Sequence, residues 1–232
     1  MKPVRFKLTQ TNIALETPSY ITTHPGLEQY AEAHTTPESI LLRKLNRETH
    51  IKLRMPNMLS GHLQGAFLQM ISQLLKPFCI LEIGTFTGYS AICLAKGLQP
   101  GGILHTIDNN PEMEDFAMPY IREAGMEKSI CIHIGEALEI VKGIEGSFDL
   151  VFIDADKDNY INYYDLVINK VPQGGLIIAD NALWYGKVLD PNALTDKETA
   201  GIVAFNEYVM NDTRVENVLL PLRDGLMMMR KL

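Results

Sequence analysis

The chain has 232 residues, of which 46% are hydrophobic, so it is long enough for one sizeable core and has a globular composition. The formal net charge is −7 and no basic tract occurs, which argues against nucleic acid as a partner. The apolar runs are too short to span a bilayer, and no apolar segment follows the early positive charges of residues 1–12. We therefore expect a cytoplasmic protein with no membrane partner.

The first 77 residues contain no convincing strand. Pro18, Pro25 and Pro37 break residues 17–37 into short helices and turns, and Thr36-Pro37-Glu38 predicts the start of a longer helix. A helical stripe follows, formed by Leu63, Phe67, Met70, Ile71, Leu74 and Leu75. We interpret residues 1–57 as a helical extension of a single domain, 1–232, whose core is 58–232.

From residue 78 onward, strands and helices alternate. The expected strands are 78–83, 103–108, 130–134, 149–154 and 175–180, and the expected helices are 90–96, 111–124, 137–141 and 159–170. Thr195-Asp196-Lys197-Glu198 fits a capping box that opens a last helix. Residues 215–221 and 226–231 predict a hairpin that turns at Arg223-Asp224-Gly225. This order predicts an α/β fold: a doubly wound, mostly parallel seven-stranded sheet with a C-terminal antiparallel hairpin and an N-terminal helical cover.

Ligands of such sheets bind beyond the carboxyl ends of the strands. The first strand ends in a glycine turn with Gly84 and Gly88, and the second ends in Asp108, which can accept hydrogen bonds from ribose hydroxyls. Phe86 stands where a dinucleotide fingerprint has its second glycine. Glu82 can accept from an ammonium group, and Ser90 with backbone amides can bind a carboxylate. The pattern therefore favours S-adenosylmethionine over a pyrophosphate cofactor.

Oxygen ligands follow two other strands. Asp154 ends one strand, and Asp180 and Asn181 end its expected neighbour. Two carboxylates and one amide oxygen suit a hard divalent cation, Mg²⁺ before Mn²⁺ or Ca²⁺. By contrast, the three cysteines show no CxxC pairing and the six histidines no HxxxH pair, so we expect reduced core cysteines and no histidine zinc site.

Three segments carry a family resemblance: LEIGTFTGYSA (81–91), FIDADKDNY (152–160) and IIADNALW (177–184). They resemble the cation-dependent O-methyltransferases of the caffeoyl-coenzyme A type, which are related to catechol O-methyltransferase. The resemblance implies a class I methyltransferase (Rossmann-like) fold, a homodimer and a catechol-like phenolic acceptor.

The resemblance also implies residue roles. Asp154, Asp180 and Asn181 match the metal ligands, and Lys157 matches a proposed general base that acts beside Asp154. The positions that match cofactor contacts are Ser60, Glu82, Gly84, Thr85, Ser90, Asp108, Ala137 and Asp156.

The acceptor is left open by the sequence. Trp184 and Tyr185 are candidate walls of its pocket, but Tyr185 stands where the plant enzymes have an asparagine, so the plant substrate does not carry over. Two alternatives remain at this point. One is an NAD-dependent dehydrogenase with the same strand–glycine–strand–acid layout, and the other is a non-catalytic S-adenosylmethionine-binding protein.

Overall fold

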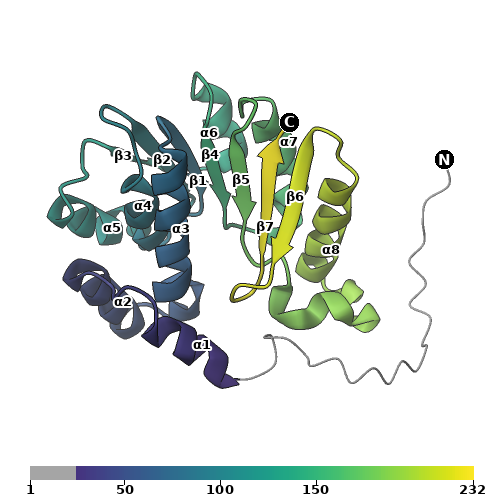
Figure 1. Cartoon of the computed structure of the whole chain (residues 1–232), viewed down its shortest axis with the longest axis horizontal. Helices are drawn as coiled ribbons and strands as arrows, with labels where there is room; N and C mark the ends of the chain where they lie inside the picture. The colour runs from purple at the N-terminus through teal and green to yellow at the C-terminus, as the bar shows by residue number, and fades with distance from the viewer. Residues whose placement is uncertain (1–24) are drawn as a thin grey trace.

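The computed structural model describes residues 25–232, with seven strands in one sheet and helices on both of its faces (Figure 1). The strands are β1 (Cys79–Ile83), β2 (Ile103–Asp108), β3 (Ile130–Ile134), β4 (Leu150–Ile153), β5 (Leu176–Ala179), β6 (Val215–Leu220) and β7 (Leu226–Lys231). Their order is β3-β2-β1-β4-β5-β7-β6. The predicted fold class is confirmed.

The first five strands are parallel, and the hairpin joins them through an antiparallel β5–β7 pair. The chain runs from β1 outward to β2 and β3, then returns to β4 on the other side of β1. This reversal leaves a crevice at the carboxyl ends of β1 and β4, which is where doubly wound sheets bind ligands.

The helices match the predicted segments closely. They are α1 (Pro25–Ala33), α2 (Ile40–Lys52), α3 (Gly61–Leu75), α4 (Tyr89–Ala95), α5 (Pro111–Glu123), α6 (Ala137–Gly143), α7 (Tyr160–Ile168) and α8 (Lys197–Met210). Short 3₁₀ turns add η1 (Pro56–Met58), η2 (Lys157–Asn159), η3 (Trp184–Leu189) and η4 (Pro191–Thr195).

Alternating strand residues divide the core into two layers. In β1, Leu81 packs with residues of α6, α7 and α8, whereas Ile80 packs with residues of α2, α3, α4 and α5. Successive side chains of a strand point to opposite faces, so each layer of helices covers its own side of the sheet. The crevice thus sits between two packed layers that hold its walls in place.

Two predicted helix starts are wrong. The helix expected from Thr36-Pro37 begins at Ile40, because the Ser39 side chain accepts a hydrogen bond from the Leu42 amide at 3.2 Å and so caps it. At the last helix, Thr195 lies in η4 and donates to the Asn192 carbonyl, and the N-cap position falls to Asp196.

Predictions about residues 1–24, including the absence of a signal peptide and the first part of the helical extension, lie outside the described residues. Within residues 25–232, no helix combines the length and apolar character needed to cross a membrane.

Candidate functional site

A cavity of about 540 Å³ opens at the carboxyl ends of the parallel strands. It gathers residues predicted from distant parts of the sequence: Ser60, Gly84, Thr85, Ser90, Asp108, Ala137, Asp154, Asp156, Lys157, Asp180, Asn181, Trp184 and Tyr185. Of the predicted site residues only Glu82 is absent from the lining, because it lies fully buried just behind it.

Gly84 begins the turn after β1, where the ends of the paired strands β1 and β4 lie side by side. Its φ is +108°, and a Cβ there would lie 1.9 Å from the Asp154 carbonyl oxygen. Both the backbone conformation and the close approach of the two strand ends therefore require glycine. This contact brings the glycine turn and the Asp154 strand end together on one wall of the cavity.

Glu82 ends a chain of buried hydroxyl groups. Thr85 and Thr106 share a 2.6 Å hydrogen bond, and the Thr106 hydroxyl donates to Glu82 Oε2 at 2.6 Å. The other carboxylate oxygen, Oε1, is buried without a hydrogen-bond partner. Burial raises the pKa of Glu82 to about 8, although the Ser90 and Thr106 hydroxyls oppose this shift. A cationic group in the cavity would satisfy this carboxylate.

Asp108 shapes the glycine turn as well as facing the cavity. Its Oδ2 accepts from the Phe86 amide at 2.8 Å, and its Oδ1 accepts from the Asn110 amide at 2.9 Å. The neighbouring Asn110 caps α5 by accepting from the Glu112 amide at 3.0 Å. The helix cap thus belongs to Asn110, and Asp108 is held at the mouth of the cavity.

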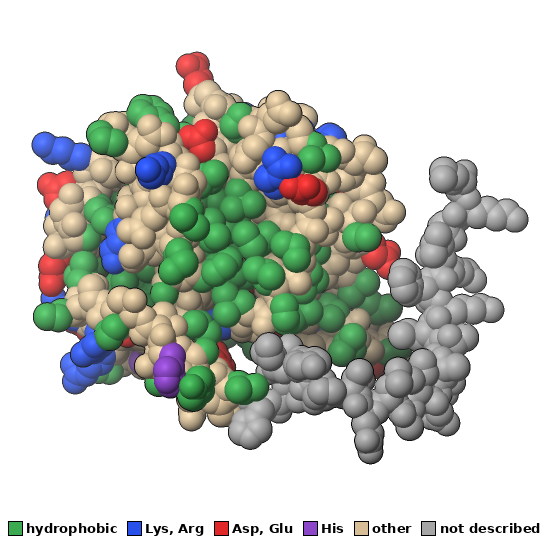
Figure 2. Space-filling model, in the orientation of Figure 1, with side chains coloured by type: hydrophobic (Ala, Val, Ile, Leu, Met, Phe, Trp, Pro, Cys, Tyr) green, Lys and Arg blue, Asp and Glu red, His purple; other side chains and the backbone are tan. Residues whose placement is uncertain are grey.

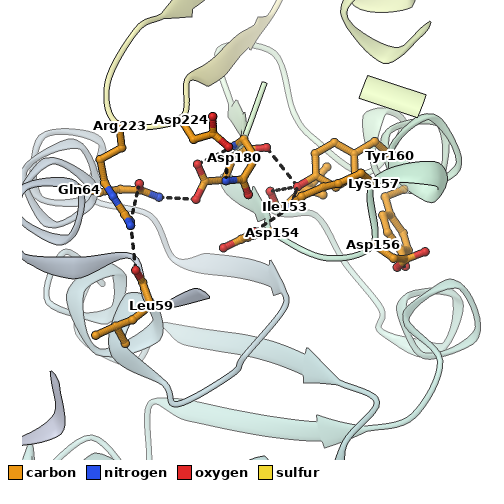
Figure 3. A network of polar contacts seen from close by, with 12 residues as sticks. Leu59, Gln64, Ile153, Asp154, Asp156, Lys157, Tyr160, Asp180, Arg223 and Asp224 are labelled. Atoms are coloured by element: carbon orange, nitrogen blue, oxygen red, sulfur yellow. Dashed lines mark hydrogen bonds and ion pairs between the residues drawn. The ribbon is translucent and has the colours of Figure 1, made fainter. Parts of the chain in front are cut away.

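The predicted oxygen ligands lie at the ends of β4 and β5 (Figure 3). Asp180 is buried; its Oδ2 accepts from Gln64 Nε2 at 2.6 Å and its Oδ1 from the Asn181 amide at 2.7 Å. Burial and the nearby charge of Asp154 raise the pKa of Asp180. A buried carboxylate whose pKa is raised by a neighbouring carboxylate favours a bound cation.

Asn181 has a left-handed backbone, with a φ of +57°, and its side chain is oriented by the closing hairpin. Its Nδ2 donates to Asp224 Oδ2 at 3.0 Å. Because the amide nitrogen is engaged by Asp224, the amide oxygen is left for another partner. Asp224 therefore orients the Asn181 side chain without being one of the predicted metal ligands.

Lys157 is almost fully buried despite its charge. Its Nζ donates to Asp154 Oδ1 at 3.0 Å and to the Tyr160 hydroxyl at 2.7 Å (Figure 3). The same atom lies 5.7 Å from the Trp184 ring centroid. Burial alone would lower its pKa, but Tyr160 and Asp154 outweigh burial and the pKa is raised. In this arrangement Lys157 carries a proton.

The FIDADKDNY segment divides by residue. Asp156 lines the cavity but also accepts hydrogen bonds from Tyr163 and Asn159, and Asp158 pairs with Lys197. Asn159 occupies the N-cap position of α7, yet its side chain forms no capping hydrogen bond. Asn159 therefore stands at the start of α7 without capping it through its side chain.

The two acceptor candidates differ in exposure. The Trp184 Nε1 is buried without a partner, whereas the Tyr185 side chain is 72% exposed. Both have positive φ angles, and the Tyr185 amide donates to Asp224 Oδ1 at 2.5 Å. Trp184 thus lines the cavity but keeps its unpartnered indole nitrogen buried, while the exposed Tyr185 also borders the cavity.

Sequence reasoning missed a second group of residues around the oxygen ligands. Gln64 on α3 contacts Asp180, and Arg223 in the hairpin turn donates from Nη1 to the Leu59 carbonyl at 3.1 Å and to Gln64 Oε1 at 3.3 Å (Figure 3). Tyr160 and Asp224 were read only as helix and turn residues. The only sequence signal near Arg223 and Asp224 was the Arg-Asp-Gly turn, and such a turn predicts a hairpin but not a contact with the oxygen ligands.

Comparisons with known proteins agree with this geometry. A family model described as O-methyltransferase matches residues 31–232. The chain is 36% identical to caffeoyl-CoA O-methyltransferase 1 of Eucalyptus globulus, with 73% of each chain covered, and 34% identical to a probable caffeoyl-CoA O-methyltransferase 2 of Dictyostelium discoideum, with 84% of each covered.

Solved structures give the same result. The Bacillus cereus O-methyltransferase in complex with SAH has a TM-score of 0.81 at 30% identity, covering 89% of this chain and 97% of that one. TomG of Streptomyces achromogenes, in complex with SAM, has a TM-score of 0.80 at 28% identity, with 89% and 96% covered. These matches argue against both alternatives, the dehydrogenase and the non-catalytic binding protein. This chain is an enzyme that belongs to the O-methyltransferase family, of the caffeoyl-CoA O-methyltransferase type.

Proposed function

We propose that this O-methyltransferase transfers the methyl group of S-adenosylmethionine to one hydroxyl of a catechol-like phenol, with the help of a divalent cation. The observation that carries the proposal is the placement of Asp154, Asp180 and Asn181 in the same cavity as the glycine turn. Such a cavity offers an oxygen-rich cation site directly beside a site for a sulfonium donor.

The chain's residues fit the methyl donor. Gly84 lets the glycine turn pack against the end of β4, and Asp108 at the end of β2 can accept hydrogen bonds from ribose hydroxyls. The unpartnered Oε1 of Glu82 is a buried acceptor for the amino group of the methionine moiety. SAM and SAH occupy the TomG and B. cereus relatives, which supports this ligand.

The chain's residues also fit a hard cation. Asp180 is held from two sides, by Gln64 and by its neighbour's amide, and Asp224 turns the Asn181 oxygen outward. Such outer contacts orient metal ligands and tune affinity. A bound divalent cation would favour the phenolate form of a substrate hydroxyl and would counteract the carboxylate charges that hold the Lys157 proton.

Lys157 is the proposed general base. Its Nζ lies beside Asp154 and under the Trp184 ring, so it is positioned at the junction of the cation ligands and the acceptor wall. With the cation bound, Lys157 would first release its own proton to water. The neutral amine would then accept the phenolic proton as the methyl–oxygen bond forms and the methyl–sulfur bond breaks. The remaining task of the chain is orientation, which Trp184 and the carboxylate set supply by fixing the plane and direction of the acceptor.

The experiment compares catechol with its 1,3-dihydroxy isomer, resorcinol, in the presence of Mg²⁺ or a chelator. We expect methylation of catechol with Mg²⁺, and neither methylation of resorcinol nor activity in chelator. Methylation of both isomers at equal rates in chelator would overturn the cation mechanism. Thermal stabilisation by SAH is the control, since it reports cofactor binding independently of the acceptor.

We also propose that the chain forms a homodimer through the face between α3 and the β6–β7 hairpin. Figure 2 shows hydrophobic side chains gathered there, and Met70 and Leu74 of α3 and Val218 of β6 are 62%, 75% and 51% exposed. On the same hairpin, Glu216 and Arg230 pair with each other. A patch that is apolar and locally neutral is complementary to itself, as a two-fold interface requires.

The test is the mass in solution by light scattering. We expect twice the chain mass of 26.0 kDa, reverting to one chain mass in Leu74→Glu. Leu189→Glu is the matched control, because Leu189 is 82% exposed on η3, which belongs to neither α3 nor the hairpin. A monomeric wild type, or a dimer that survives Leu74→Glu, would contradict this interface.

A further inference from the structure

Three side chains with metal-binding atoms meet on the outer strands of the sheet, outside the cavity. They are His105 of β2 and Cys131 and His133 of β3, and their ligand atoms lie within 4.8 Å of one another. All three are half-buried, and none takes part in the proposed methyl transfer. Sequence spacing did not predict them, because the set is split between two strands.

The sheet register explains why they meet. In the parallel β2–β3 pair His105 lies opposite Cys131, and Ile107 lies opposite His133. Cys131 and His133 are two residues apart, so both project from the same face as His105. The His105 Nδ1 and His133 Nε2 atoms lie 3.0 Å apart. The backbone of the sheet itself therefore holds the three side chains on one face.

The two imidazoles are electronically suited to a metal. Burial lowers the pKa of His105 and of His133, which favours the neutral form of both rings that a metal requires. Within residues 25–232, neither ring forms an ion pair with a carboxylate. One ring nitrogen must donate to the other in the metal-free protein, and this weak pairing is readily exchanged for a metal–nitrogen bond.

We propose that His105, Cys131 and His133 form a site for a borderline transition-metal ion, with Zn²⁺ as the expected occupant. Two imidazole nitrogens and a thiolate are ligands that Zn²⁺ prefers and Mg²⁺ does not. Zn–N bonds of about 2.0–2.1 Å and a Zn–S bond of about 2.3 Å place tetrahedral ligands roughly 3.3–3.6 Å apart. In the structure the two imidazole nitrogens lie 3.0 Å apart, and all three ligand atoms lie within 4.8 Å of one another. Small side-chain rotations would bring these distances into the range that the metal requires. Water completes the fourth position.

The site would have a mechanical consequence. β3 is an edge strand, and a metal bound by His105 and His133 would fasten it to β2. Three residues after His105 comes Asp108, and two after His133 comes Gly135, and both line the cavity. The ion would therefore stabilise the strand pair that carries one wall of the cofactor site, although it lies outside that site and does not depend on the proposed activity.

The experiment is a Co²⁺ titration of the metal-free full chain, because Co²⁺ replaces Zn²⁺ and reports a thiolate ligand by a ligand-to-metal charge-transfer band. We expect one Co²⁺ per chain to carry that band, in addition to any Co²⁺ on the oxygen set, and we expect Cys131→Ser and His133→Gln to lose the band. The band should survive in Cys79→Ala, the other half-buried cysteine, and in Asp180→Asn, which alters only the oxygen set. A wild type without the band, or a band that persists in Cys131→Ser, would overturn the proposal.

Thermal unfolding gives a second readout. In the Asp180→Asn background, which disables the oxygen set, Zn²⁺ at 100 times its Kd should raise the Tm by about 5–10 °C, and adding Cys131→Ser should abolish this rise. SAH is added to each variant as a control for folding, because it should stabilise all of them. Equal stabilisation of the Asp180→Asn protein by Zn²⁺ with and without Cys131→Ser would assign the effect to other residues.

Discussion

Replacing Glu82 by Gln should make the protein more stable at high pH and weaken its cofactor binding. The carboxyl group is fully buried, one of its oxygens has no partner, and burial raises its pKa from 4.5 to about 8. A folded-state pKa above the unfolded one means that the fold favours the protonated acid. The stability is therefore greatest below pH 4.5 and falls as the pH rises to about 8.

The size of this effect follows from the same values. The rise from 4.5 to about 8 corresponds to roughly 5 kcal/mol of unfolding free energy, at about 1.4 kcal/mol per pH unit. The Gln variant avoids this loss, but its buried amide has a donor without a partner, at a cost of about 1–3 kcal/mol. The variant should therefore be less stable than the wild type at pH 5 and more stable at pH 9.

The assay is urea unfolding at both pH values, with SAH binding measured by calorimetry at pH 7. Losing the charged partner of the amino group should weaken SAH by about 10- to 150-fold, since hydrogen bonds to charged groups contribute about 1.5–3 kcal/mol. Glu139→Gln, at an exposed position on α6, is the control and should change neither quantity. Parallel stability curves for Glu82→Gln and the wild type would refute the reasoning.

Three further predictions concern the cation side of the cavity. Asp154→Ala and Asp180→Ala should abolish methyl transfer to catechol and leave SAH binding largely intact; full activity of both in chelator would contradict the cation role. Lys157→Met should lower kcat by about 10²–10⁴-fold with a smaller change in KM, and an unchanged kcat would remove Lys157 as the base. Asp224→Ala should raise the Mg²⁺ concentration needed for half-maximal activity by about 10–100-fold, because Asn181 loses the contact that orients its amide; an unchanged requirement would show that Asn181 is oriented otherwise.

The strand ends were predictable because the signals are local. Hydrophobic runs of strand length end in Glu82-Ile83-Gly84, in Asp108 and in Asp154, and parallel strands carry their ends to one edge of a sheet. A local sequence signal can mispredict a helix start when the same residue can serve either as a helix cap or in the preceding turn. Thr195 fits a capping box, but its hydroxyl closes the preceding turn on Asn192, so the cap position moves to Asp196.

The His105–Cys131–His133 cluster shows the limit of spacing rules. Such rules search one helix or loop for ligands at fixed intervals, as in HxxxH or CxxC. Here the interval along the chain is 26 residues between His105 and Cys131, and only the register of β2 against β3 makes them neighbours. A prediction would have required the strand order and the register, and neither is encoded in the local pattern.

The role of the closing hairpin follows from the direction of one strand. β7 pairs antiparallel with β5, with Met227 opposite Ala179, so the turn before β7 must lie beside the carboxyl end of β5. There the Ala182 and Leu183 amides donate to the Gly225 and Asp224 carbonyls, both at 2.9 Å. A parallel partner would have carried its preceding turn to the opposite edge of the sheet. The antiparallel addition is thus what brings Asp224 to the predicted ligand Asn181, and it makes the hairpin turn part of the cavity wall although it is the last segment of the chain.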